Sequence, residues 1–220
     1  MLATWRPAEA LPASPSPPIY RFDGRLTSFR SSHGHRLNGF IQAPLHTFNP
    51  HADFTVSAWV YAGEPEVGAC ALAIETPNMK VPILSIAEYD KNRFFVARIR
   101  RDGGDPNKRY DIDLSTARVG QQFSGERWYH LSLVKDERRM RFFLDDALVD
   151  SLDCEQLKPY DAPKPQLVIG RSSQDGDRCH QWGGTIEAVK IWDRAVTLDE
   201  IKETVFKKPS PAGLDASRFT

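Results

Sequence analysis

Apolar and polar residues alternate at every second position along much of this chain, which is the period of a β-strand and not of a helix. The clearest run covers residues 54–61. One side of this run carries Phe54, Val56, Ala58 and Val60, and the other side carries Thr55, Ser57, Trp59 and Tyr61. Because both sides are bulky, we predict a central strand that is covered on both faces.

Further apolar or alternating runs, bounded by turn residues, predict many more short strands. They cover residues 81–87, 93–101, 110–114, 127–135, 139–144, 148–152, 166–170 and 185–192. Only residues 198–206 predict a helix, because Thr197 is a good N-cap and Glu200 follows three residues later, as in a capping box. Since strands and helices do not alternate, the pattern indicates an all-β sandwich or barrel.

The two ends of the chain lack this pattern. Five prolines stand within residues 7–18, and proline fixes φ and removes a backbone donor. We therefore predict an extended arm or linker over residues 1–18, and a tail over residues 207–220, which also carries proline and glycine. The intervening residues 19–206 are enough for one all-β domain with a sizeable core.

The charge balance narrows the classes of partner. Lys plus Arg and Asp plus Glu both number 29, so the chain has no net charge at neutral pH. A neutral chain lacks the field that draws proteins to nucleic acid or to an anionic membrane, and we expect neither as a partner. The sequence has no run of about 18 apolar residues and no signal-peptide pattern, so we expect no membrane insertion, and a cytoplasmic location if Met1 is the native start.

The three cysteines are Cys70, Cys154 and Cys179. An odd number leaves at least one thiol free, so the chain is not a disulfide scaffold. A bridge between Cys154 and Cys179 stays open, because both fall at predicted loop positions. Free buried thiols are favoured, since nothing in the sequence indicates an oxidising compartment.

Four segments, in this order, resemble the laminin-G-like jelly roll, a concanavalin A-like fold shared by pentraxins, laminin G modules and lectin-like domains. They are residues 19–24 (IYRFDG), 53–60 (DFTVSAWV), 128–136 with 141–146 (WYHLSLVKD and RFFLDD), and 167–170 with 182–196 (LVIG and WGGTIEAVKIWDRAV). The resemblance implies an all-β, two-sheet antiparallel jelly-roll sandwich over residues 19–206, with one short C-terminal helix. It also implies a binding domain.

Within these motifs, we expect Val189 and Ile191 to face the core, and Trp59 and Trp128 to be core anchors and not platforms for sugars. One departure from the family pattern is a turn. The usual Asp-Gly pair is replaced by an Asp-Asp pair at residues 145–146, so we expect Asp146 to take the positive φ that such a turn needs.

Motifs for catalysis are not visible in the sequence. It has no nucleophile elbow, no phosphate loop and no zinc-protease motif. Glycosidases of this sandwich carry a Glu-x-Asp-x-x-Glu strand, which is also missing, so we expect no enzyme activity. His33, His35, His46 and His51 lack the spacing of a known zinc site, and we expect polar loop residues there. In a strand, His130 should be hydrogen-bonded and partly buried.

The loop at residues 171–181 is the candidate binding site. Loops gather at the ends of a sandwich, where a rigid scaffold positions them. Arg171, Gln174 and His180 are the candidate ligand-binding residues, and Asp175 and Asp177 are candidate calcium ligands around an Asp-Gly-Asp turn. A solvated loop without a ligand is the alternative.

Three functions remain open at this point. The first is a non-catalytic module that binds a carbohydrate, with calcium as the one candidate cofactor. The second is a protein-interaction domain or accessory subunit of a larger enzyme such as a hydrolase. The third is a hydrolase whose active site is not recognisable in the sequence.

Overall fold

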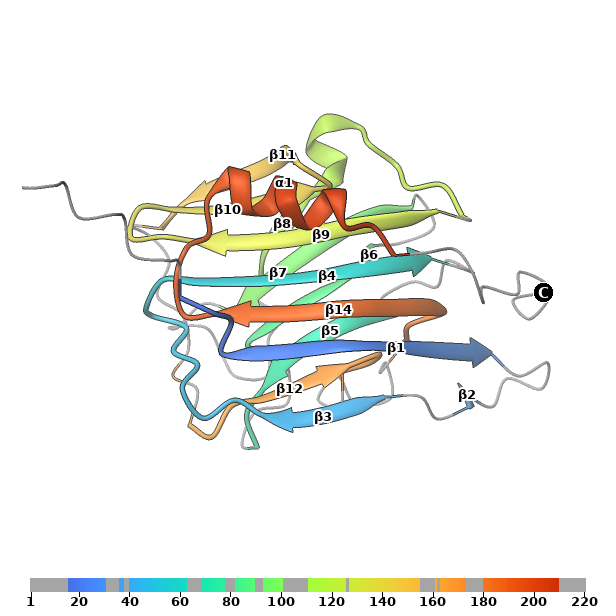
Figure 1. Ribbon diagram of the computed structural model, residues 1–220, viewed down its shortest axis with the longest axis horizontal. Coiled ribbons are helices and arrows are strands. Elements are labelled where there is room, and N and C mark those ends of the chain that lie inside the picture. Colours follow the sequence, from blue (N-terminus) through green and yellow to red (C-terminus); the bar gives the residue numbers. More distant parts are fainter. Residues whose placement is uncertain are drawn as a thin grey trace, which may run out of the picture.

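The computed structural model describes residues 16–30, 36–37, 40–62, 69–77, 82–89, 93–100, 111–125, 127–154, 161, 163–172 and 180–209. Over these residues the chain forms two stacked β-sheets, with one α-helix lying on the outside of the first (Figure 1). The predicted all-β jelly-roll sandwich is therefore confirmed. Within the described part, β1 begins at Tyr20 and α1 ends at Phe206.

The strands follow the chain in this order: β1 (Tyr20–Arg30), β2 (Arg36–Leu37), β3 (Ile41–Pro44), β4 (Phe54–Ala62), β5 (Ala69–Glu75), β6 (Leu84–Tyr89), β7 (Phe94–Arg100), β8 (Asp111–Ser115), β9 (Trp128–Lys135), β10 (Arg139–Leu144), β11 (Ala147–Asp153), β12 (Gln166–Ile169), β13 (His180–Gln181) and β14 (Gly184–Trp192). A short 3-10 helix, η1 (Thr116–Val119), follows β8, and α1 (Leu198–Phe206) follows β14.

The first sheet has the strand order β11-β10-β9-β4-β14-β1-β2, and it is called the helix-side sheet because α1 lies on its outer face (Figure 1). All its pairings are antiparallel. Strand β4 lies between β9 and β14, so it is central, as its two bulky faces predict. Phe54, Val56, Ala58 and Val60 point into the sandwich.

The second sheet has the order β3-β12-β5-β6-β7-β8, with the short β13 pairing β5, and it is called the loop-side sheet because the candidate loop joins β12 to β13. The β13–β5 pair is parallel and the other pairs are antiparallel. Every residue of β5 is buried, including its polar end at Glu75.

The core lies between the two sheets. Met140, Phe142 and Leu144 share the inner face of β10 and are buried there, as the alternation predicts. Val189 and Ile191 also reach this core from β14, so their predicted orientation is confirmed. The outer faces of both sheets are partly covered as well. Helix α1 lies on one of them, and the start of the candidate loop lies on the other.

Helix α1 covers part of the outer face of the helix-side sheet. The predicted capping box is present, since the Thr197 side chain accepts a hydrogen bond from the Glu200 backbone and the Glu200 side chain accepts one from the Thr197 backbone. Ile201 is buried against Val134 and Phe143 of the sheet. The helix therefore packs with its apolar stripe inward.

One prediction about a single residue needs correction, and some strands were not predicted. Asp145, and not Asp146, takes the positive φ of the β10–β11 turn, at 56°. The cause is its carboxylate, which accepts a hydrogen bond from the His130 backbone at 3.0 Å and pairs with Arg127 at 2.9 Å. Strands β3 and β5 were not predicted, because neither β3 nor the uniformly apolar β5 shows a long alternation.

Trp59 and Trp128 are buried, at 2% and 3% exposure, but they are not part of the core between the sheets. They lie on the outer face of the helix-side sheet with Tyr61. The burial of both tryptophans was predicted correctly, but their predicted place in the core was wrong. Period-two alternation does not say which face of a doubly covered strand points inward.

Cys70 and Cys154 are free, buried thiols, so the bridge from Cys154 that the sequence left open does not form. Cys179 lies outside the described residues. None of the described helices is long and apolar enough to span a membrane.

A candidate ligand-binding loop on the loop-side sheet

The candidate loop closes at a hydrogen-bonded base. The backbone N–H of Gly170 donates to Ala71 at 2.8 Å, and that of Trp182 donates to the Gly170 carbonyl at 2.8 Å. Trp182 is 1% exposed, and its indole donates to the Tyr61 carbonyl at 3.3 Å. Residues 171–181 thus leave and rejoin the sandwich at one rigid point, as a binding loop on a scaffold requires.

The first residues of the loop turn back over the sheet. Gly170 has a φ of 94°, which a residue without Cβ adopts easily. Gly170 pairs with Ala71, yet Ser172 donates from Oγ to Oε1 of Glu75 at 2.9 Å. Ala71 and Glu75 are about 13 Å apart along β5, so the chain must fold back onto the outer face of the loop-side sheet to make this contact. Both side chains are buried.

Arg171 is held by an aromatic ring. Its guanidinium carbon lies 3.5 Å from the centre of the Phe40 ring, which is a cation–π contact. Arg171 is half-buried, and its Nε has no hydrogen-bond partner among the described residues. A guanidinium fixed on a ring and still able to donate is suited to a carboxylate or another oxygen acceptor.

The other predicted site residues are described only in part. His180 lies in β13 and pairs with Ala69 of β5, so the structure places both ends of the loop beside β5. Gln174, Asp175 and Asp177 lie outside the described residues. In the part of the chain that the structure covers, no three His, Cys, Asp or Glu side chains gather as a metal site would need. The calcium site therefore stays a prediction.

Sequence reasoning missed a polar row beside the loop. Six residues that are paired from each strand to the next form a line across the outer face of the loop-side sheet. They are Gln42, Val168, Ala73, Ser85, Arg98 and Asp113. We call this line the cross-sheet row. Its middle is small and buried, and its ends carry exposed or half-exposed polar groups. Only the strand register brings these residues together, so the signal needed was the pairing of β3 and β5, neither of which was predicted.

The polar ends of this row are fixed by their neighbours. The amide nitrogen of Gln42 donates to Oε1 of Gln166 at 2.6 Å. Arg98 donates from Nε to the Asp113 carboxylate at 3.2 Å. Preset amide, guanidinium and carboxylate groups can exchange hydrogen bonds with a polyhydroxylated ligand at little cost in side-chain entropy.

Solved structures with this architecture are similar to the chain at low identity. A carbohydrate-binding module (CBM40) of the Ruminococcus gnavus IT-sialidase, bound to α2,3-sialyllactose, has a TM-score of 0.62 and 14% identity, over 86% of this chain and 99% of the module. A heptameric SAP-like pentraxin from Limulus polyphemus has a TM-score of 0.53 and 13% identity, over 84% of this chain and 74% of the pentraxin.

A third similar structure is the binding domain of botulinum neurotoxin DC in complex with rat synaptotagmin II. It has a TM-score of 0.56 and 12% identity, over 83% of this chain and 43% of that one. No curated protein sequence matches the chain. At these identities the likeness concerns the fold.

The family is established by sequence. A laminin G family model, described as the concanavalin A-like lectin/glucanases superfamily, matches residues 34–202. That range includes β4, β9, β10, β12 and β14, which carry three of the four motif segments. The match covers most of the chain and agrees with the two-sheet sandwich, so the chain belongs to the concanavalin A-like lectin/glucanase superfamily.

Proposed function

We propose that this chain is a non-catalytic ligand-binding module whose ligand is a glycan. The observation that carries the proposal is the Arg171 guanidinium, which is stacked on Phe40 at the rigid base of a loop. The Gln42 end of the cross-sheet row lies on the same sheet, two residues along the chain from Phe40. Together they supply fixed donors and acceptors of the kinds that sugar hydroxyls and carboxylates bind.

An acidic sugar is the first ligand to test. A guanidinium binds a carboxylate through parallel N–H donors, so Arg171 favours a glycan with an acidic group. The similar CBM40 module is bound to α2,3-sialyllactose, and the likeness covers 86% of this chain and 99% of the module. Both points support sialyllactose as the first probe.

The test is calorimetric titration of sialyllactose, and of neutral lactose, into the parent chain and into Arg171→Ala. We expect binding of the acidic sugar by the parent and at least a tenfold loss in the variant. Arg138→Ala, which removes an exposed arginine from the β9–β10 turn, is the matched control and should bind like the parent. Binding that is equal in the parent and Arg171→Ala would remove Arg171 from the site. No binding to any member of a glycan array would remove the glycan proposal.

We further propose that Asp175 and Asp177 hold a calcium ion next to the glycan. Calcium prefers oxygen ligands, and the two carboxylates flank a glycine that permits a tight turn. Calcium titrated into the parent should release or absorb heat, and it should not do so with the double variant Asp175→Asn, Asp177→Asn. No heat from the parent would remove the ion from the proposal.

A protein ligand is the second candidate, as a domain that docks onto a larger enzyme. Two large apolar side chains support it, since Phe206 is 88% exposed and Leu148 is 52% exposed. Exposed apolar residues of this size are common at protein interfaces. Loss of partner capture from the native host by Phe206→Ser with Leu148→Ser, together with unchanged glycan binding, would favour this second function.

A further inference from the structure

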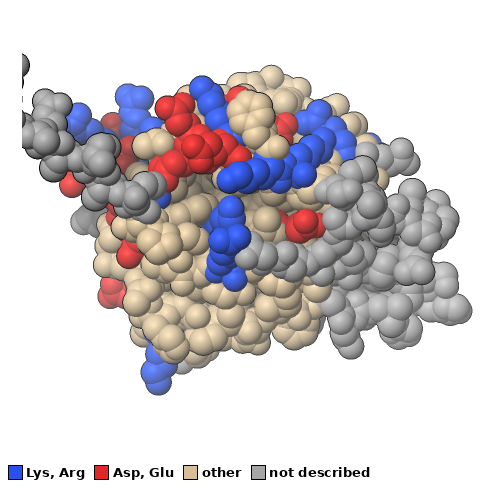
Figure 2. Space-filling view, in the orientation of Figure 1, with Lys and Arg blue, Asp and Glu red and all other residues tan. Residues whose placement is uncertain are grey.

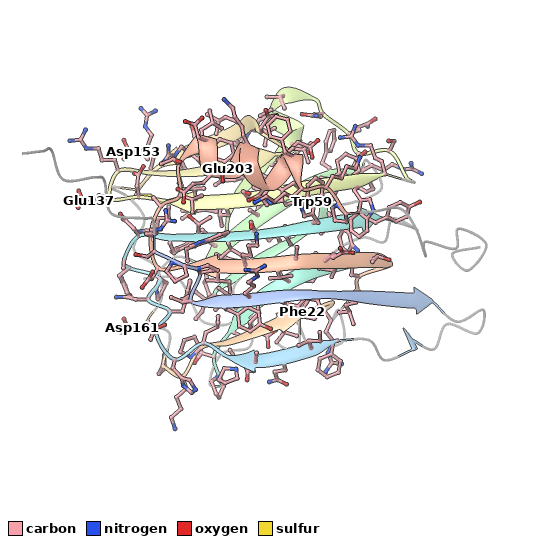
Figure 3. The ribbon with its side chains drawn as sticks, viewed as in Figure 1. Phe22, Trp59, Glu137, Asp153, Asp161 and Glu203 are labelled. Atoms are coloured by element: carbon pink, nitrogen blue, oxygen red, sulfur yellow. The ribbon has the colours of Figure 1, made fainter. Side chains whose placement is uncertain are left out.

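Beneath α1 lies a second cluster with polar groups that the proposed function does not use. Trp59, Tyr61 and Trp128 are buried on the outer face of the helix-side sheet, and Val205 of α1 packs against them. Trp59 belongs to β4, and Figure 3 labels it beside the C-terminal end of α1. The His130 ring lies against Trp59, with 5.1 Å between the ring centres. A titratable ring is thus buried in an aromatic layer.

The hydrogen bonds of His130 are incomplete. The ring is 1% exposed, its Nδ1 is 3.3 Å from Oγ of Ser132, and its Nε2 has no partner among the described residues. Ser57, which pairs with Ser132 across β4 and β9, has a buried Oγ that also has no hydrogen-bond partner in the described part of the chain. A neutral imidazole can leave one nitrogen as an unused acceptor. An imidazolium needs acceptors for two N–H groups, and one of these N–H groups would have none.

The charges around the ring also favour the neutral form. Burial and the nearby Lys190 ammonium on β14 together lower the pKa of His130 to about 3, against a smaller opposite effect of a hydrogen bond between the ring and the Asp145 backbone. Glu187, also on β14, pairs with Trp59, which separates it from His130 in the strand register. Asp145 is paired with Arg127.

The charged groups of α1 have other partners or are exposed. Glu200 accepts two hydrogen bonds from Arg194, and Lys202 lies 3.8 Å from Asp199. Glu203 is exposed. In Figure 2, charged side chains gather on the solvent side of the region around α1. None of the described carboxylates contacts the His130 ring, so a proton on this ring would be poorly compensated while α1 stays in place.

Helix α1 is a short element on the outside of the sandwich. It has nine residues, and among them only Ile201 is fully buried. A short helix is held mainly by tertiary packing, and β4 and β9 are held by ladders on both sides. We propose that His130 is an acid-sensitive latch: protonation of its ring releases α1 from the helix-side sheet and uncovers Trp59, Tyr61 and Trp128. This inference is independent of the glycan proposal, which concerns the opposite sheet.

The size of the effect follows from linkage. Only the open form binds the proton readily, so the ratio of closed to open forms falls by up to about tenfold for each pH unit below the ordinary histidine value of about 6.5. At pH 4.5 the ratio should be about a hundredfold lower than at pH 7. The uncovered surface would carry three aromatic side chains, and such a surface suits a partner met in an acidic compartment.

The test is hydrogen exchange of the α1 amides at pH 7 and pH 4.5, corrected for intrinsic rates, together with tryptophan fluorescence. Protection of residues 201–206 should fall about a hundredfold at pH 4.5, with a red shift of the emission, while β4 and β9 stay protected. In His130→Gln both changes should disappear. His51→Gln removes an exposed histidine and is the matched control, which should respond like the parent.

A second variant tests the release of α1 if His130→Gln does not fold. Lys190→Met removes the cation that opposes protonation of the closed form, so the release of α1 should move to lower pH. Unchanged α1 protection in the parent at pH 4.5 would overturn the latch. Equal loss of protection in β4, β9 and α1 would overturn it too, because it would indicate global unfolding. An unshifted response in Lys190→Met would also contradict it.

Discussion

The two sheets of this sandwich cover their outer faces in different ways. On the helix-side sheet, Trp59 and Trp128 lie under α1, and the contact is aromatic and aliphatic. On the loop-side sheet, the central residues are small or polar, such as Ala73 and Glu75, and the start of the candidate loop is fastened by a hydrogen bond from Ser172. One face is covered by packing and the other by a few directional contacts.

This difference separates stability from binding. Large aromatic side chains contribute free energy through the area they bury, so the helix-side covering should account for more of the folding free energy. Directional polar contacts contribute less, but they fix the geometry of groups that still face solvent, such as Arg171. The loop-side covering is therefore where a ligand can bind at little cost to the fold.

The largest loss of stability is expected from a substitution in the packing beneath α1. Trp59→Ala should lower the free energy of unfolding by about 3–5 kcal/mol, because it removes a buried aromatic side chain and leaves a cavity under α1. Denaturant unfolding measures the change. Gln166→Ala, on the loop-side sheet, is the comparison and should change stability by less than about 0.5 kcal/mol. Similar losses in both variants would mean that the two faces do not differ in the way described.

An intermediate effect is expected at the loop-side covering. Ser172→Ala removes the donor to Glu75 and should cost about 1–3 kcal/mol, since a buried carboxylate then loses a hydrogen bond. Thermal unfolding in parallel with Ser151→Ala, an exposed serine on β11, measures it. If Ser172→Ala leaves stability unchanged but weakens glycan binding, the contact only orders the loop.

A smaller effect is expected at the start of α1. Glu200 accepts hydrogen bonds from Arg194, which lower its pKa to about 2. A lowered pKa means that the contribution to stability is complete above the ordinary value of about 4.5 and is lost as the pH falls toward 2. Glu200→Gln should cost about 1 kcal/mol at pH 7. Between pH 4.5 and 2 the variant should lose less stability than the parent, and parallel curves would contradict the pairing.

Much of the fold follows from the sequence, because apolar and polar residues alternate over long runs in β4, β9, β10 and β14. The capping box at Thr197 and Glu200 is local, so it was also predicted correctly. Strand β5 was missed because all its residues are buried, and its uniform apolar run gives no alternation to detect. The sign of φ at Asp145 depends on contacts with His130 and Arg127, which lie outside the local sequence.

The candidate site could be predicted only as a loop. The amino-acid types of residues 171–181 predicted a polar, irregular loop. The structure adds that Arg171 stacks on Phe40 and that Ser172 contacts Glu75. Both partners are far away in the sequence, and no local pattern links them. The cross-sheet row depends on the register of six strands, which a single sequence does not define.

The smallest expected effect tests whether a polar contact on this molecule stabilises it merely by being present. His51 and Asp161 are 3.0 Å apart, with side chains that are 47% and 95% exposed. Water screens such a pair and its ordering costs side-chain entropy, so His51→Gln and Asp161→Asn should each change the free energy of unfolding by less than about 0.5 kcal/mol. A double-mutant cycle by urea unfolding isolates the coupling between them. The contact at Ser172 is buried and this one is not, so the two should differ several-fold. A coupling as large as the loss in Ser172→Ala would show that burial does not set the strength of polar contacts here, and the contrast between the two outer faces would then lose its physical basis.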